Sequence, residues 1–170
     1  CGQMPKCVYY VEGESEKALI AALRQPPLRL PPGKVKVLNP VQNLIPRSLL
    51  LTLQPETIVI LVFDTDVPRA ECLRKNLDHL RRYCAKVKII TLAQVLNLED
   101  ELVRATDVKA ARELTQSATA SEFKTDFCAK PPAECRALLE RHRLDMEKLW
   151  AAQPPEPFSF VEQNGGQVKR

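Results

Sequence analysis

Short runs of apolar and β-branched residues recur along the first half of the chain, separated by stretches that contain charged residues. Runs of this length and composition are typical of β-strands. The third run, Thr-Ile-Val-Ile-Leu-Val-Phe, is almost wholly apolar, which favours a central strand buried on both faces. We predict four strands, over residues 7–11, 34–38, 57–63 and 86–90.

Between these runs, apolar positions recur at helical spacing. Residues 14–24 have apolar side chains at positions 18, 19, 22 and 23, and Pro26 and Pro27 end that helix. Residues 43–53 and 68–83 are also predicted helices. Strands that alternate with helices predict an α/β fold: a four-stranded parallel sheet, in the order 2-1-3-4, flanked by helices.

The pattern changes after residue 91, and no convincing strand follows until 158–161. Prolines and then glycines after residue 152 are typical of a loop followed by a frayed end. Helical spacing recurs over 92–104, 107–116 and 133–152, and 121–129 is ambiguous.

These patterns divide the chain into three parts that together form one compact domain. We predict an α/β core over 4–91, a helical extension over 92–152 that packs on the core, and a loop with a flexible tail over 153–170. Met4 and the residues after it resemble a natural start, so residues 1–3 are left out of this prediction.

Composition excludes several classes of protein. With 45% hydrophobic and 27% charged residues, the chain is neither collagen-like, nor a coiled coil, nor wholly disordered. A net charge of +4 is compatible with a nucleic-acid partner but too weak to argue for one. Aromatic residues make up only 5%, which excludes an array of stacking rings for single strands.

Apolar runs and cysteines bear on location. No run approaches the roughly 20 apolar residues that cross a bilayer, and the N-terminal stretch lacks the apolar segment of a signal peptide. The six cysteines are scattered and include no CxxC pair. We therefore expect reduced thiols, a cytoplasmic location and no membrane association.

Acidic residues follow two of the predicted strands. Glu12, followed by Gly13, comes after the first strand, and Asp64 and Asp66 come after the third. In open α/β sheets, ligands bind beyond the carboxyl ends of strands, where the strand order reverses. In the order 2-1-3-4 the reversal lies between the first and third strands, so we expect these carboxylates to converge on one crevice.

Converging carboxylates repel one another unless a cation lies among them. Oxygen ligands suit Mg²⁺ or Mn²⁺, which take one or two carboxylates together with water and substrate phosphate. Gly13 is expected to allow a sharp backbone turn, with its N–H directed at a substrate phosphate near the helix N-terminus. The alternative is structural, because Asp commonly starts turns, and Glu14 and Glu16 suit the first turn of a helix.

The Val-Glu-Gly that contains Glu12 and the Phe-Asp-Thr-Asp that contains Asp64 and Asp66 resemble the Toprim domain. This catalytic module occurs in topoisomerases, bacterial primases, recombination proteins, small ribonucleases and OLD-type nucleases. The stretch Tyr-Tyr-Val-Glu-Gly-Glu-Ser-Glu-Lys over 9–17 is most similar to the stand-alone and OLD-like branch of bacterial defence-related nucleases. The resemblance covers about residues 6–91.

The resemblance implies roles for individual residues. Glu12 is expected to be the general acid/base and a metal ligand, and Asp64 and Asp66 are expected to bind Mg²⁺. Glu99, in Asn-Leu-Glu-Asp-Glu-Leu, is the candidate for a second metal position. Lys124 is the candidate catalytic lysine in the C-terminal helical part. Lys130 is the alternative to it, although either lysine also suits an ordinary solvated surface.

The function implied by the resemblance is Mg²⁺-dependent hydrolysis of phosphodiesters in RNA or DNA. The partners implied are nucleic acid and an ATPase or other protein, with a homodimer as a further expectation. Two alternatives stay open. The Asp64-Thr65-Asp66-Val67 stretch also resembles the nucleophile motif of HAD phosphatases, although that family carries it on its first strand. A Toprim-like fold can also serve only as a metal- or nucleotide-binding module or a scaffold.

Overall fold

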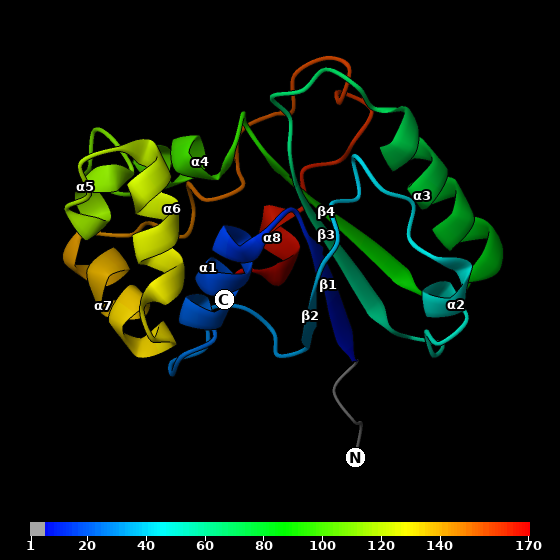
Figure 1. Ribbon diagram of the computed structural model, residues 1–170. Helices are drawn as coiled ribbons and strands as arrows, with labels where there is room; N and C mark the ends of the chain where they lie inside the picture. The colour runs from blue at the N-terminus through cyan, green and yellow to red at the C-terminus, as the bar shows by residue number, and fades with distance from the viewer. Residues whose placement is uncertain (1–5) are drawn as a thin grey trace.

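The computed structural model describes residues 6–170, so the predicted start at Met4 lies outside the described residues. Its centre is a four-stranded, all-parallel sheet in the order β2-β1-β3-β4 (Figure 1). The strands are β1 (Cys7–Val11), β2 (Lys34–Val37), β3 (Ile58–Asp64) and β4 (Lys88–Gln94). The predicted fold class, the parallel pairing and the strand order are confirmed, and the topology is Rossmann-like.

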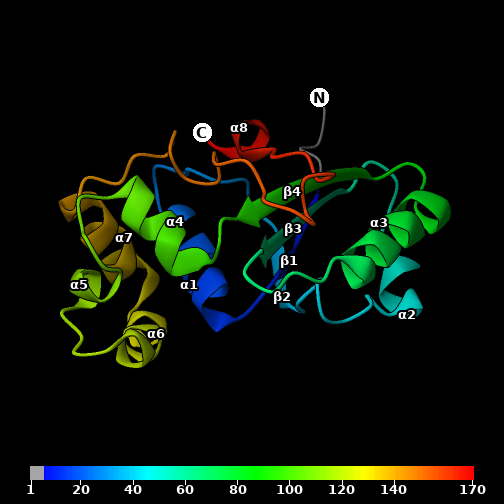
Figure 2. The ribbon, with the colours of Figure 1, turned by 90° about the horizontal axis from the view of Figure 1, so that it is seen from above.

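Helices cover both faces of the sheet. One group, consisting of α1 and α4 to α7, lies on one side, whereas α2 and α3 lie on the other (Figures 1 and 2). Their bounds are α1 (Glu14–Leu23), α2 (Arg47–Leu50), α3 (Glu71–Tyr83), α4 (Leu98–Ala105), α5 (Arg112–Thr115), α6 (Ala120–Ala129), α7 (Pro132–Arg141) and α8 (Gly165–Val168). None of the helices in the described part of the chain is long and apolar enough to span a membrane.

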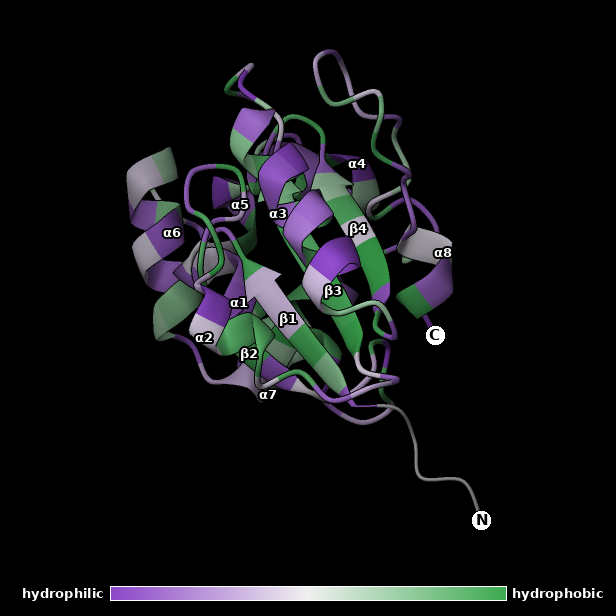
Figure 3. Cartoon of the chain, turned by 90° about the vertical axis from the view of Figure 1, so that its right-hand side faces the viewer, coloured by the Kyte–Doolittle hydropathy of each residue, from purple (hydrophilic) through white to green (hydrophobic). Residues whose placement is uncertain are grey.

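The sheet separates two hydrophobic cores. Because side chains alternate along a strand, Tyr9 and Val11 pack on the α1 side, and Tyr10 packs on the α3 side. Residues 59–63 of β3 are all fully buried, which explains why this run has no polar position. Figure 3 shows the polar outer side of α3 in front of the apolar strands β3 and β4.

The second predicted helix is much shorter in the structure. Residues 39–45 form a loop instead, held by the buried side chain of Asn76 on α3. The Asn76 amide nitrogen donates to the carbonyls of Pro40 (2.7 Å) and Asn43 (2.9 Å), and its oxygen accepts from the Ile45 N–H (2.8 Å). This side chain satisfies three backbone groups of the loop and thereby stabilises the loop conformation.

Two other boundaries differ from the prediction. Strand β4 continues to Gln94, four residues beyond the predicted end, so residues 92–94 are strand and not helix. The predicted helix over 133–152 ends at Arg141, and Arg143 and Trp150 adopt left-handed φ angles of 59° and 53°. The ambiguous stretch after Thr119 is helix α6, with the Thr119 hydroxyl as its N-cap.

The segment over 153–170 is not a frayed end, in contrast to our prediction. Phe158 is fully buried and its ring lies 6.1 Å from that of Phe63 on β3. The Thr91 hydroxyl on β4 donates to the carbonyl of Glu162 at 2.6 Å, and Val168 in α8 is buried. The tail therefore covers one edge of the sheet as part of the core.

Candidate functional site

Polar side chains gather at the carboxyl ends of the strands. Glu12 directly follows β1, Asp64 is the last residue of β3, Gln94 is the last residue of β4, and Asn39 lies two residues beyond β2. Because all four strands are parallel, these residues share one edge of the sheet. The topology therefore brings together groups that lie far apart in the sequence.

Glu12 and Asp64 are in direct contact. The backbone N–H of Asp64 donates to Glu12 Oε2 at 3.1 Å, across 52 residues of sequence. Both carboxylates are half-buried. Asp64 and Gln94 are the last paired residues of β3 and β4. The Gln94 amide nitrogen donates to Asp64 Oδ1 at 2.7 Å. The structure thus places Glu12 and Asp64 in one crevice, as the strand order led us to expect.

Glu16 is a further carboxylate of this cluster, and we interpreted it only as a first-turn residue. Its side chain is buried and its Oε1 accepts from the Gln94 amide nitrogen at 3.3 Å. A signal for this burial exists in the sequence. Glu16 precedes Leu19, Ile20 and Leu23 by three, four and seven residues, so it lies on the apolar face of α1.

Gln94 and Asn39 were also missed. Gln94 was overlooked because the fourth strand was predicted to end at residue 90, which leaves position 94 away from any strand end. Asn39 follows a short strand and hydrogen-bonds Glu12, which opposes the rise of the Glu12 pKa. No pattern of apolar spacing marks either residue, since both are polar groups that face other polar groups.

Burial and mutual repulsion raise the pKa values of the clustered carboxylates. Desolvation, and then the negative charges of Glu12 and Glu16, raise the pKa of Asp64 to about 8, although the Gln94 hydrogen bond opposes this. Desolvation also raises the pKa of Glu12 and of Glu16. Perturbed pKa values of several acids in one cleft are typical of functional sites.

The cluster opens into a cavity of about 430 Å³. Residues from the helical extension form its other wall: Lys124 of α6 lies 3.7 Å from Glu99 of α4, measured between Nζ and Oε1. Cys128, one turn further along α6, also lines it. The predicted site residues that line this cavity are Glu12, Gly13, Asp64, Glu99 and Lys124.

Two predicted residues stand apart from the cavity wall. Asp66 is exposed and does not line the cavity, although its charge contributes to the raised pKa values of Glu12 and Asp64. Lys130, the alternative to Lys124, does not line the cavity either. Of the two lysines, the geometry therefore favours Lys124.

The backbone at Gly13 does not require glycine. The chain bends at residues 12 and 13 as expected, but the Gly13 φ of −164° and ψ of −171° are extended values that any residue adopts. A Cβ at this position would lie 3.5 Å from Glu16 Oε2, an ordinary contact. The absence of a side chain leaves the N-terminus of α1 open to the cavity.

The donor set suits a cation that keeps most of its own water. Among residues 6–170, no three His, Cys, Asp or Glu side chains form a ready-made metal site. Mg²⁺ does not need one, because it commonly binds through one or two carboxylates with water and phosphate oxygens as its other ligands. Glu12 and Asp64 provide such a pair, and the raised pKa of Asp64 reflects negative charge that a cation would offset.

Comparisons with protein-family models, with curated proteins and with solved structures gave no significant match. The class of protein therefore rests on topology and site: an α/β, Rossmann-like domain with an acidic crevice at the carboxyl edge of its sheet.

Proposed function

We propose that this chain is a Toprim-type, Mg²⁺-dependent nuclease domain that hydrolyses phosphodiesters in nucleic acid. The observation that carries the proposal is the contact between Glu12 and Asp64 in a cavity that Glu99 and Lys124 also line. This set unites one acidic residue from each of the two Toprim-like motifs with the ammonium group of Lys124 on the opposite wall. The parallel order β2-β1-β3-β4 supports the same interpretation.

Each residue has a role that follows from its environment. Glu12 and Asp64 would hold Mg²⁺, which polarises the phosphoryl oxygens and the attacking water when bound. Burial raises the pKa of Glu12, and a raised pKa is the direction that suits a carboxylate for proton exchange. Lys124 is largely exposed and reaches over the cavity, where its ammonium group would offset charge on the phosphate in the transition state.

Gly13 and Asp66 complete the proposed site. The open N-terminus of α1 at Gly13 would accept a phosphate oxygen through backbone N–H groups. Asp66 would lie at the rim of the cavity, where its carboxylate would accept hydrogen bonds from water bound to the metal. We also propose an ATPase or another protein as a partner that selects the target, in keeping with the OLD-like resemblance.

The second candidate function is a non-catalytic module that binds metal or nucleotide. The contact between Glu12 and Asp64 supports it too, because a pair of carboxylates can hold a cation without any proton transfer. The two candidates make different predictions for Glu12, because a binding module requires ligands but no residue that exchanges a proton.

A metal-dependent cleavage assay tests the proposal. Labelled single-stranded RNA, tRNA, single-stranded DNA and duplex DNA are incubated with the protein in Mg²⁺, Mn²⁺ or EDTA. We expect cleavage that requires metal and falls about 10²- to 10⁴-fold in Glu12→Gln. The control is Asp78→Asn on α3, an exposed carboxylate that does not line the cavity.

Three other outcomes would count against the nuclease. Metal binding without cleavage of any substrate, alone or with added cell extract, would favour the binding module. Hydrolysis of a phosphomonoester with phosphorylation of Asp64 would favour the HAD-like alternative. Cleavage that persists in the double variant Asp64→Ala and Asp66→Ala would exclude metal catalysis at this site.

A further inference from the structure

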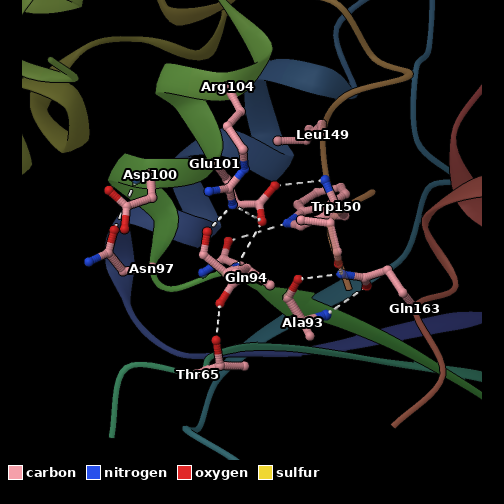
Figure 4. A network of polar contacts seen from close by, with 12 residues as sticks. Thr65, Ala93, Gln94, Asn97, Asp100, Glu101, Arg104, Leu149, Trp150 and Gln163 are labelled. Atoms are coloured by element: carbon pink, nitrogen blue, oxygen red, sulfur yellow. Dashed lines mark hydrogen bonds and ion pairs between the residues drawn. The ribbon is translucent and has the colours of Figure 1, made fainter. Parts of the chain in front are cut away.

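Gln94 lies at the centre of a buried polar network behind the candidate site (Figure 4). Its side chain is fully buried at the end of β4. Its backbone carbonyl accepts from both the N–H (3.2 Å) and the hydroxyl (2.9 Å) of Thr65, which directly follows Asp64. Main-chain bonds therefore hold Gln94 beside the loop that begins at Asp64.

The side-chain amide of Gln94 has one chemically consistent orientation. Its nitrogen donates to Asp64 Oδ1 (2.7 Å) and Glu16 Oε1 (3.3 Å), which uses both N–H groups. Its oxygen accepts from the indole Nε1–H of Trp150 at 3.4 Å. An indole N–H only donates, so the reversed amide would place its own N–H groups against the indole N–H and lose this bond.

The indole that orients this amide is itself fixed. Trp150 is buried in the core between the sheet and the helical extension. Its backbone N–H donates to Glu101 Oε1 at 2.9 Å, and the other oxygen of Glu101 pairs with Arg104 at 2.7 Å. Glu101 is fully buried, and its Oε2 also accepts from the Val95 N–H at 2.9 Å, next to Gln94.

We propose that Gln94 is a positioning residue of the candidate site. Its amide, oriented by Trp150, holds the Asp64 and Glu16 carboxylates in place so that Asp64 presents its second oxygen to a cation. Gln94 is no ligand itself, since its amide nitrogen cannot bind a cation and its amide oxygen is directed at Trp150. This proposal rests on the proposed function, because the cation it prepares for is the one assigned to Glu12 and Asp64.

A second consequence concerns detection. Trp150 is the only tryptophan of the chain and connects to Asp64 through a single intervening side chain. A cation bound at the second oxygen of Asp64 would weaken the bond that Oδ1 accepts from the Gln94 amide, and would thereby alter the hydrogen bond on the indole. Trp150 fluorescence and the NMR resonance of its Nε1–H should therefore report cation binding without any substrate.

The test uses Mn²⁺ alone as the probe. Affinity is measured by calorimetry and by Trp150 emission for the full chain and for Gln94→Met, which keeps the length of the side chain and removes its hydrogen bonds. The matched control is Gln163→Met. The Gln163 amide bonds the backbone of the adjacent Ala93 (3.0 and 2.7 Å) and the carbonyl of Ala152 (2.8 Å), but neither carboxylate.

We expect Gln94→Met to weaken Mn²⁺ binding at least tenfold and to abolish the metal-dependent emission change, whereas Gln163→Met keeps the original affinity. Trp150→Phe, which retains a ring and removes the N–H, should weaken binding several-fold, as measured by calorimetry. Thermal unfolding of each variant separates these effects from loss of the fold. Equal Mn²⁺ affinity of Gln94→Met and the unaltered protein would overturn the proposal.

If the unaltered protein binds no Mn²⁺, the proposed function fails. A measurement without metal then tests whether Gln94 positions Asp64. The Trp150 Nε1–H resonance is then compared in the unaltered protein, Gln94→Met and Asp64→Ala. A shift of this resonance in both variants would show that Gln94 links Asp64 to Trp150. An unchanged resonance in Asp64→Ala would refute that link.

Discussion

Ionisation of the Asp64 side chain lowers the stability of the folded protein. Its folded pKa of about 8 lies above its ordinary value of 3.8, mainly because the side chain is desolvated. The folded protein therefore binds this proton more tightly than the unfolded chain does. The resulting stabilisation is complete below pH 4 and is lost as the pH rises through 8.

We predict that Asp64→Asn stabilises the metal-free protein. The variant removes the buried charge and keeps an oxygen that accepts from Gln94, so the free energy of unfolding at pH 8 should rise by about 1–3 kcal/mol. Urea unfolding in EDTA at pH 4 and pH 8 measures this, and the gain should vanish at pH 4. The exposed Asp66→Asn serves as the control, and a loss of stability in Asp64→Asn at pH 8 would contradict the prediction.

Gly13 provides a test of phosphate binding that leaves the fold intact. Gly13→Ala meets no close neighbour and needs no unusual φ, so we expect unchanged or slightly higher stability, by up to about 1 kcal/mol. The new methyl group would restrict access to the N-terminus of α1, and cleavage should fall about tenfold through weaker substrate binding. Thermal unfolding and steady-state kinetics measure the two effects, and full activity would exclude a phosphate contact at this position.

At the level of elements, the tail over 153–170 is the part whose contribution differs most from our expectation. It adds no strand, yet it contributes Phe158 to the core on the α3 side of the sheet. Its polar groups pair with β4, where the N–H groups of Thr91 and Ala93 donate to the side-chain oxygens of Asn164 and Gln163 instead of to a further strand. The tail thereby closes the open edge of β4.

We therefore predict a large effect of Phe158→Ala. Removal of a fully buried aromatic ring should lower the free energy of unfolding by about 3–5 kcal/mol. Phe160→Ala is the matched control, since Phe160 is 37% exposed and has the Arg74 guanidinium over its ring, and it should cost less than about 1 kcal/mol. Urea unfolding measures both, and similar values for the two variants would mean that the tail does not belong to the core.

For the whole molecule, the helical extension completes the candidate site. The α/β core supplies Glu12 and Asp64, whereas Lys124 and Glu99 come from α6 and α4. Phe123 and Phe127, stacked at 5.3 Å, place α6 in the core beside α1. The cavity therefore exists only when the extension is docked on the sheet.

This arrangement predicts that substitutions of Lys124 in α6 and of Lys130 directly after α6 have different effects on cleavage. Lys124→Ala should lower the cleavage rate about 10²-fold with little change in stability, since the side chain is 62% exposed and its ion pair with Glu99 is at 3.7 Å. Lys130→Ala, which changes the same charge outside the cavity, should retain activity. Equal activities of the two variants would remove Lys124 from the site.

The spacing of apolar residues was sufficient to predict the parallel α/β class and the approximate place of every strand. Burial explains this success, because residues 59–63 must be apolar to lie between two helical layers. The same reasoning failed at the second helix, where a loop is held by the Asn76 side chain, 31 residues from Ile45 in the sequence. Local propensity contains no information about such a distant partner.

At the candidate site too, some features followed from the sequence and others depended on partners far away along the chain. Glu12 and Asp64 could be named in advance because parallel strands share a carboxyl edge, a rule that depends only on element order. The hydrogen bonds that join Glu16, Gln94 and Trp150 to this site were visible only in the tertiary structure. Burial of apolar surface is encoded residue by residue along the chain, whereas the pairing of buried polar groups depends on which elements the fold places side by side.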